Sequence, residues 1–227
     1  MIRAAALLAA VLAATLPAAN AATAIFVEKA RLADPAPAPN GGDERAQYDH
    51  QTFEQSVALH TIVPGDGVVI AIRNSVESGP NGDSSYYEKF SIELPASSPG
   101  PDVDLGDKRV KTRYVHGMTY FPFSPSDTYA TAASGTLSVR REDNPDFLAV
   151  EMKVSFDLGK ARVPGHLLPI MDCVGRGRAR RADRDELTPF FGAPVDFQHK
   201  HSAIKPGKAR VDDAPFHLYC DWRRAKQ

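Results

Sequence analysis

Hydrophobic and polar residues alternate along much of this chain. The longest alternation is Phe147–Leu158, in which every second residue from Leu148 onward is apolar and most of the residues between are polar. A period of two predicts a β-strand with one buried and one exposed face. Gly135–Arg141 shows the same pattern, and the turn-forming cluster Glu142–Asp146 separates the two segments. The sequence therefore predicts an antiparallel hairpin here.

Further segments show the same alternation, and turn-forming residues separate them. Pro64–Gly67 indicates a turn between two of these strands. No long segment has the 3.6-residue period of a helix, so we expect only short helical turns, at Asp183–Leu187 and Asp43–Tyr48. The predicted fold class is all-β, a mainly antiparallel β-sandwich or open barrel with long loops. The remaining predicted strands are Thr23–Leu32, Phe53–Val63, Val68–Ile72, Glu88–Leu94 and Phe216–Trp222, and the predicted long loops are Asp34–Asp49, Ser75–Ser85 and Ala96–Asp107.

The first 21 residues have the pattern of a secretory signal peptide. Arg3 precedes an alanine-rich apolar run, and Ala19-Asn20-Ala21 is a small-x-small cleavage pattern. We expect cleavage after about Ala21, leaving a single β-rich domain over residues 22–227. The alternative is an uncleaved anchor helix, but the run is short for a membrane span. The later sequence has no apolar run that could cross a bilayer, and the alanine-rich signal favours a bacterial, extracytoplasmic protein, either periplasmic or secreted.

The charge balance excludes one class of function. The chain has 27 basic and 28 acidic residues, a formal net charge of −1. A dedicated nucleic-acid-binding protein would usually carry a basic excess, so we expect no nucleic-acid partner.

The two cysteines, Cys173 and Cys220, predict a disulfide bond. Exported proteins fold in oxidising compartments, where two cysteines usually form a bridge. The alternation at the C-terminal end places Cys220 on the same face as Trp222, which is the buried face of the predicted strand. Two buried thiols, or a thiolate metal site, are the alternatives.

The stretch FQHKH raises the possibility of a metal site. In an extended segment His199 and His201 lie on one face, where both imidazoles could bind zinc or copper, and His217 is the best third ligand. Neighbouring lysines oppose a cation, and no complete metal-binding motif is present. We therefore expect no cofactor and keep the metal site as an alternative.

An arginine-rich stretch is the first candidate for ligand binding. The segment RGRARRADRDE contains five arginines that could bind phosphate, sulfate or carboxylate groups through paired hydrogen bonds. The competing interpretation is a solvated loop whose arginines pair with its own acidic residues. The candidate residues are Arg176, Arg178, Arg180, Arg181 and Arg184.

No nucleophile or phosphate-loop motif appears in the chain, which lowers the expectation of catalysis without excluding it. The sequence favours an exported, non-catalytic binding or envelope-associated domain. Its partner would be an anionic or carbohydrate ligand, such as an envelope glycan or a lipid headgroup, or another envelope protein. The alternatives are a metal-binding protein or metal-dependent enzyme, and a structural subunit that pairs through an open sheet edge.

Overall fold

The structure of this chain is a computed structural model, in which strands form almost all of the regular structure. It describes residues 21–34, 59–78, 84–96, 100, 102–120, 123–130, 132–158, 162–163, 166–167, 170–187, 190 and 215–223. No helix among these residues is both long and apolar enough to span a membrane.

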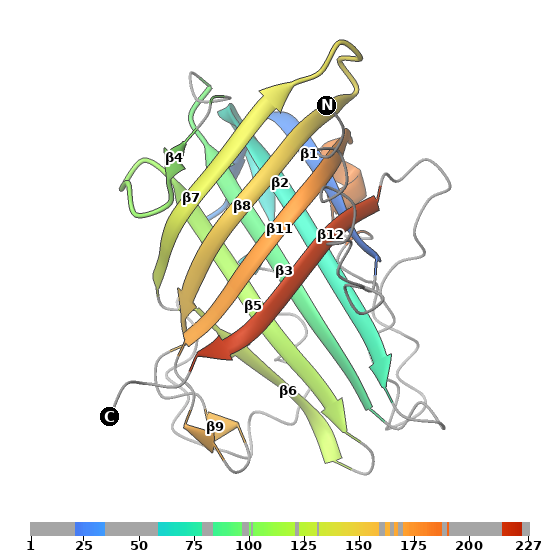
Figure 1. Ribbon diagram of the computed structural model, residues 1–227. Helices are drawn as coiled ribbons and strands as arrows, with labels where there is room; N and C mark the ends of the chain where they lie inside the picture. Colours follow the sequence, from blue (N-terminus) through green and yellow to red (C-terminus); the bar gives the residue numbers. More distant parts are fainter. Residues whose placement is uncertain are drawn as a thin grey trace, which may run out of the picture.

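One ten-stranded sheet dominates the fold, in the order β4-β7-β8-β11-β12-β1-β2-β3-β5-β6 (Figure 1). Neighbouring strands are antiparallel except for one short parallel contact between β1 and β11. β9 (Arg162–Val163) and β10 (His166–Leu167) form a separate small hairpin, and η2 (Arg184–Glu186) is a 3-10 turn. The strands of the main sheet are β1 (Ala21–Leu32), β2 (Ile62–Ser78), β3 (Ser84–Leu94), β4 (Val103–Asp104), β5 (Lys111–Tyr120), β6 (Phe123–Tyr129), β7 (Ala132–Arg141), β8 (Phe147–Asp157), β11 (Ile170–Arg181) and β12 (Pro215–Arg223).

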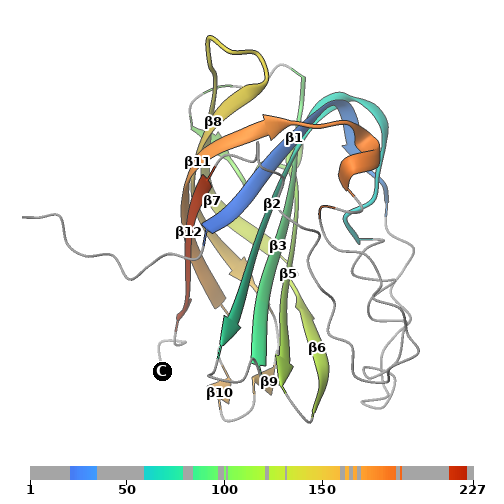
Figure 2. The ribbon, with the colours of Figure 1, turned by 90° about the vertical axis from the view of Figure 1, so that its right-hand side faces the viewer.

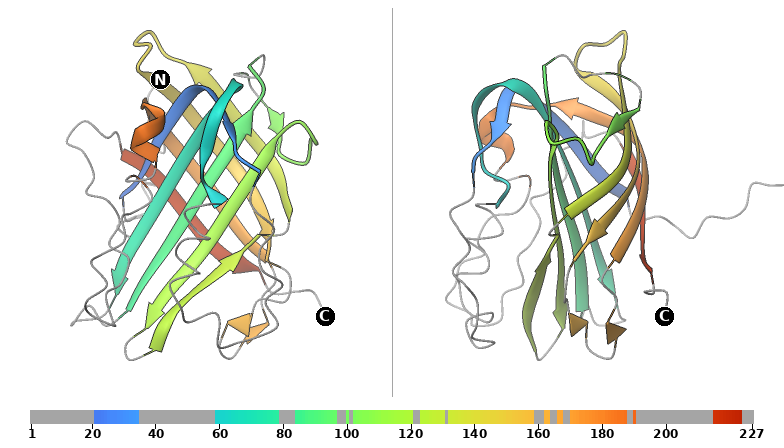
Figure 3. Two further views of the ribbon diagram at one scale, coloured as in Figure 1. Left: turned by 180° about the vertical axis from the view of Figure 1, so that it is seen from behind. Right: turned by 90° about the vertical axis from the view of Figure 1, so that its left-hand side faces the viewer.

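The sheet is strongly curved, so its two halves face each other (Figures 2 and 3). We call β4, β7, β8, β11 and β12 the β8 wall, and β2, β3, β5 and β6 the β3 wall. β1 joins the walls, because its first residues pair with β12 and the rest of the strand pairs with β2.

The hydrophobic core fills the space between the walls. Phe156 of β8 packs against two rings of the β3 wall, with centroid distances of 5.3 Å to Phe90 and 4.2 Å to Tyr114. All three side chains are buried. Because one face of each strand points into this core, the period-two pattern of the sequence is the direct consequence of the fold.

The all-β, mainly antiparallel prediction is confirmed, and so is the hairpin of residues 135–158, which is β7 and β8. The described strands of the main sheet form one continuous hydrogen-bonded ladder, so the structure does not show the two separate sheets of a sandwich. The ladder is not closed: within the described residues, β4 and β6 lie at its two ends.

The predicted turn at Pro64–Gly67 is wrong. These residues belong to β2, where Pro64 pairs with Ala30 of β1. A register shift between Glu28 and Ala30 bends the neighbouring strand there, and Lys29 has a φ of 53°. Gly67 is needed because a Cβ atom would lie 2.5 Å from the Leu94 carbonyl oxygen. The glycines thus permit a sharp bend within a strand.

Two further predictions, a disulfide bond and a helical turn, are confirmed. The disulfide joins Cys173 of β11 to Cys220 of β12, directly opposite each other in the ladder. The helical turn expected at Asp183–Leu187 is present as η2. Residues 1–20 lie outside the described residues, so the signal peptide stays a prediction; β1 begins at Ala21.

Candidate functional site

Arg176 and Arg178 lie on strand β11, not in the loop that the sequence suggested. Both side chains are exposed on the outer face, while Gly175 lies on the inner face. A Cβ atom on Gly175 would come within 2.7 Å of the Phe216 ring, so only glycine fits there without rearrangement. This half of the strand shows no alternation of apolar residues, because its inner positions 175, 177 and 179 are glycine or alanine.

Strand pairing brings a second arginine next to Arg178. Arg140 of β7 pairs in register with Ala149 of β8, and Ala149 pairs in turn with Arg178 of β11. Arg140 and Arg178 therefore flank a methyl side chain on the outer face of the β8 wall. Because alanine is short, the surface between the two guanidinium groups is hollowed.

The next outward row continues this site. Ser138 of β7, Glu151 of β8, Arg176 of β11 and His217 of β12 are in register across four strands. The two rows line an open pocket of about 500 Å³. Its lining residues are Ser138, Arg140, Ala149, Val150, Glu151, Arg176, Gly177, Arg178 and His217.

Positive charge prevails in this pocket, which we call the arginine pocket. Arg178 is held in place by Glu142, with a shortest nitrogen–oxygen distance of 2.6 Å, and its guanidinium carbon lies 3.9 Å from the centre of the Phe147 ring. Arg140 and Arg176 make no ion pair with any other described residue. Even with Glu142 and Glu151 counted, the three guanidinium groups exceed the carboxylates.

An exposed apolar patch adjoins the arginine pocket. In the following outward row Lys153, Val174 and Tyr219 lie in register on β8, β11 and β12. Val174 is 55% exposed and Tyr219 is 62% exposed. An exposed aromatic side chain beside guanidinium groups offers a surface for stacking as well as for hydrogen bonding.

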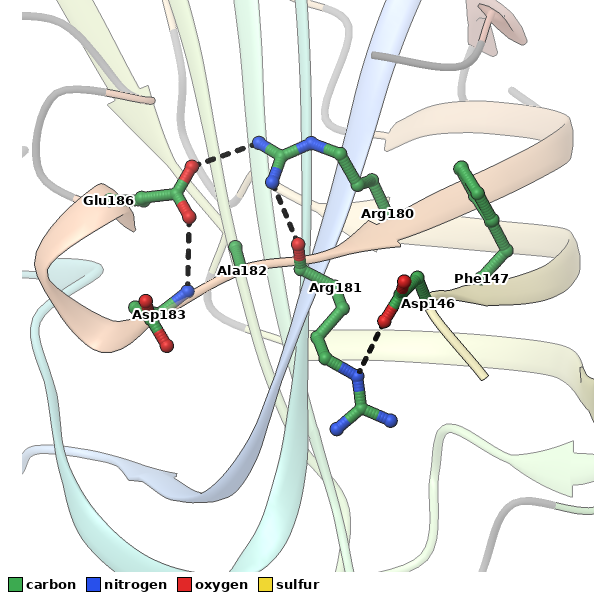
Figure 4. Close-up of a pocket in the computed structure, with 7 residues that line it drawn as sticks. All are labelled: Asp146, Phe147, Arg180, Arg181, Ala182, Asp183 and Glu186. Atoms are coloured by element: carbon green, nitrogen blue, oxygen red, sulfur yellow. Dashed lines mark hydrogen bonds and ion pairs between the residues drawn. The ribbon is translucent and has the colours of Figure 1, made fainter. Parts of the chain in front are cut away.

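Arg180, the third candidate arginine, is committed to the fold. Its guanidinium donates to the Arg181 carbonyl oxygen at 2.7 Å and to Glu186 at 3.0 Å, as Figure 4 shows. The other Glu186 oxygen accepts from the Asp183 backbone N–H at 3.2 Å. These contacts fasten η2 to the end of β11, and Arg180 is buried.

Arg181 is also used structurally. Its guanidinium forms an ion pair with Glu28 of β1 at 2.6 Å and donates to the Pro145 carbonyl oxygen at 2.9 Å. It also lies 3.5 Å from Asp146, as Figure 4 shows. Burial acts to raise the pKa of Glu28, but hydrogen bonds from Arg181 and Arg141 outweigh it and hold this pKa below its ordinary value. The open pocket of about 390 Å³ beside Arg180 and Arg181 therefore has few free charges to offer a ligand.

Arg184, the last candidate, is exposed on η2 and lines neither pocket. Leu187 and Phe190, which follow it, are buried in a small cluster on the outer side of β1 and β2. The structure thus separates the five predicted residues: Arg176 and Arg178 share a pocket, and Arg180, Arg181 and Arg184 do not join them.

The proposed metal site of His199, His201 and His217 stays a prediction, because two of its three residues are not described. His199 and His201 lie outside the described residues, and His217 is exposed in the arginine pocket, where the guanidinium groups oppose a cation. Within the described ranges, no group of three or more histidine, cysteine, aspartate or glutamate side chains could hold a metal ion.

A second polar cluster lies on the inner face of the β3 wall. Asn74, Glu88 and His116 are in register on β2, β3 and β5. Asn74 donates to Glu88 at 2.8 Å, and the other Glu88 oxygen lies 3.8 Å from His116 Nδ1. Burial raises the pKa of Glu88 to about 7, although the Asn74 hydrogen bond opposes this, and lowers the pKa of His116 to about 4. From the β8 wall, Trp222 packs edge-on against His116, with ring centroids 5.2 Å apart.

A serine–histidine contact occurs on the outer face of the same wall. His60 Nδ1 lies 2.6 Å from Ser91 Oγ. Burial, together with the charges of Lys89 and Arg113, lowers the pKa of His60 well below its ordinary value. Ser91 has no exposed surface, so this contact holds the segment before β2 against β3 and does not present a nucleophile.

The sequence reasoning missed Arg140, Asn74, Glu88 and His116. Glu88 has the parity of the apolar residues that follow it on β3, so it is a charged residue in a buried position. His116 similarly shares the parity of Tyr114. Extending each apolar alternation by one step would have found both residues. Arg140 can be recognised as a candidate only when strand pairing shows that it lies near Arg178.

Comparison with known proteins gives no further guidance. The chain matches no protein-family model, no curated protein and no solved structure.

Proposed function

We propose that this protein is an exported, non-catalytic β-domain that binds an acidic carbohydrate through the arginine pocket. The ligand would carry sulfate, phosphate or carboxylate groups on sugar rings, as acidic glycans of a cell envelope do. Arg140, Arg176 and Arg178 would bind the anionic groups, and Tyr219 would contact a sugar ring.

The observation that carries this proposal is the convergence of arginines from two strands around a hollow. Arg140 and Arg178 flank Ala149, and Arg176 occupies the adjacent row. Guanidinium groups present parallel N–H donors that match the oxygen atoms of sulfate, phosphate and carboxylate groups. Glu142 and Phe147 already hold Arg178 in place, which reduces the entropy lost when a ligand binds.

Two other observations support the exported, glycan-binding part of the proposal. The disulfide between Cys173 and Cys220 is typical of proteins from oxidising compartments. Tyr219 is exposed beside the pocket, where packing inside the protein does not require an aromatic ring. An exposed tyrosine is well suited to stack on the apolar face of a sugar.

Binding of dextran sulfate tests the proposal. We expect the protein to bind this polymer and not neutral dextran, with an affinity that falls as salt concentration rises. Arg140→Gln combined with Arg176→Gln should weaken binding at least tenfold, because a hydrogen bond to a charged group contributes about 1.5–3 kcal/mol. Isothermal titration calorimetry measures both affinities.

The matched control is Lys108→Gln combined with Arg184→Gln. Both residues are exposed and outside the arginine pocket, and this variant removes the same formal charge. We expect its affinity for dextran sulfate to stay within about twofold of the wild type. Equal weakening by both double variants would mean that net charge, and not this pocket, attracts the polymer.

A further inference from the structure

The inner face of the β3 wall changes from apolar to polar at one cross-strand row. Asn74, Glu88 and His116 form this row, and Tyr114 on β5 precedes it toward the core. Glu88 is 8% exposed and Tyr114 is 1% exposed. A row of hydrogen-bonding side chains at this depth is costly unless its atoms are paired.

Several of these atoms have no hydrogen-bond partner among the described residues. They include Asn74 Oδ1, His116 Nδ1 and the Tyr114 hydroxyl, and each is buried. The 3.8 Å separation of Glu88 and His116 is too long for a hydrogen bond. The row therefore contains hydrogen-bond acceptors beside the Glu88 carboxylate that have no donor among the described residues.

The charge of the row is also uncompensated. Glu88 is held by a neutral amide from β2, and among the described side chains the titratable groups that face it are His116 and Tyr114 from β5. From β12 the row meets Trp222, and the nearby disulfide does not titrate. His116 is neutral above about pH 4, and burial with the nearby Glu88 raises the pKa of Tyr114 well above its ordinary value. Above pH 7 Glu88 thus carries a buried negative charge without a cationic partner among these groups.

We infer that this row binds the ammonium group of a small organic amine. An alkylammonium has three N–H donors, and the row has three kinds of acceptor for them: the Glu88 carboxylate, Asn74 Oδ1 and His116 Nδ1. Trp222 flanks the site with an aromatic ring, which favours an organic cation. A metal ion is a poorer match because Glu88 and His116 are only two ligands of the kind it needs.

The negative charge of Glu88 repels an anion, and a neutral alcohol would leave that charge uncompensated. The site and the arginine pocket lie on opposite faces of the sheet, so this inference does not depend on the proposed glycan binding.

Tryptophan fluorescence tests the inference directly, because Trp222 is the chain's one tryptophan. The probes are methylamine, butylamine and 2-phenylethylamine, with 2-phenylethanol as the neutral analogue. At pH 8 we expect a saturable change with at least one amine, and at least tenfold weaker binding of the alcohol. Amine affinity should rise between pH 6 and pH 8 as Glu88 loses its proton.

Glu88→Gln provides the decisive variant, since it keeps an acceptor for Asn74 and removes the charge. We expect at least a tenfold loss of amine affinity, whereas Asp185→Asn, at an exposed residue of η2 that lines neither pocket, should leave it unchanged. If no amine binds, if the alcohol binds as well as the amine, or if E88Q keeps its affinity, the row is structural and the inference is wrong.

A measurement on the wild type keeps the test valid if E88Q does not fold. The Trp222 fluorescence of the free protein should titrate near pH 7 with Glu88. A saturating amine should lower that midpoint by about one pH unit or more, because the bound cation stabilises the carboxylate. An unchanged midpoint would overturn the inference.

Discussion

At the scale of single residues, Gly135 shows how closely the strands of the β8 wall approach. Its φ is 124°, a conformation that side chains rarely adopt, and a Cβ atom there would lie 2.1 Å from the Lys153 carbonyl oxygen. Its own carbonyl oxygen accepts from the Leu105 backbone N–H at 2.9 Å. Gly135 therefore holds the segment around β4 to the hairpin.

We expect Gly135→Ala to lower the free energy of unfolding by about 3 kcal/mol or more, since backbone strain adds to a clash with a main-chain atom. Gly100→Ala is the matched control, because no atom lies within 4 Å of the position that its Cβ would take and its effect should stay within about 0.5 kcal/mol. Urea denaturation measures both changes. Similar stabilities for the two variants would contradict the close approach at Gly135.

Glu88 should make stability depend on pH. Its pKa is raised to about 7 by burial, so the folded state holds a proton that the unfolded state releases near its ordinary pKa of 4.5. The stability contributed by the neutral carboxyl is therefore present at low pH and lost as pH rises toward 7. His116, with its pKa lowered to about 4, acts in the opposite direction between about pH 4 and its ordinary value of 6.5.

Comparison with E88Q isolates the contribution of Glu88. We expect the wild type to lose about 2–3 kcal/mol relative to E88Q between pH 5 and pH 8, because about two pH units of the range between the two pKa values are crossed, at about 1.36 kcal/mol each. Urea denaturation of both proteins at the two pH values measures this difference. A difference that does not change with pH would show that the carboxyl does not have a raised pKa.

At the scale of elements, β11 shows how small inner side chains make room for a large side chain on the neighbouring strand. Residues 175, 177 and 179 are glycine or alanine, so the inner face of β11 leaves room for Phe216 of β12. The outer face carries the exposed arginines of the pocket. Because the inner face of β11 carries only glycine and alanine over residues 175–179, this half of the strand escapes a periodicity argument, although the pairing with β8 spans nearly the whole length of β11.

The disulfide fastens β11 to β12. Cys173 and Cys220 are opposite each other in the ladder, and their sequence separation of 47 residues makes the closed loop long. We expect Cys173→Ala combined with Cys220→Ala to lower the free energy of unfolding by about 2–4 kcal/mol, because the bridge restricts the unfolded chain. Urea denaturation measures the loss, and the wild type treated with a reductant should lose a similar amount. No loss in either case would contradict a bridge in the folded protein.

At the scale of the whole molecule, the curvature of one sheet creates two chemically different faces. The inner face encloses the aromatic core and the Glu88 row, and the outer face of the β8 wall presents the arginine pocket to solvent. β1 makes the curvature possible by pairing with β12 at its start and with β2 along the rest of its length. The two proposed binding sites therefore lie on opposite faces of the sheet.

The sequence by itself determined the strands with a clear alternation and which side of each of them is buried, but it did not predict β5, β6 and β11. Alternation is a local property, so β8 and the inward face of β12 with Cys220 could be predicted from neighbouring residues alone. The bend at Pro64–Gly67 was beyond that reasoning, because turn-forming residues look the same in a bend as in a turn.

Only the tertiary structure decided which strands are neighbours. Arg140 meets Arg178, and Glu88 meets His116, through pairings between segments far apart in the chain. A period of two specifies a face but not a partner, since the backbone hydrogen bonds that join strands are the same for every sequence. Both candidate sites depend on that choice, and so they became visible only in the folded sheet.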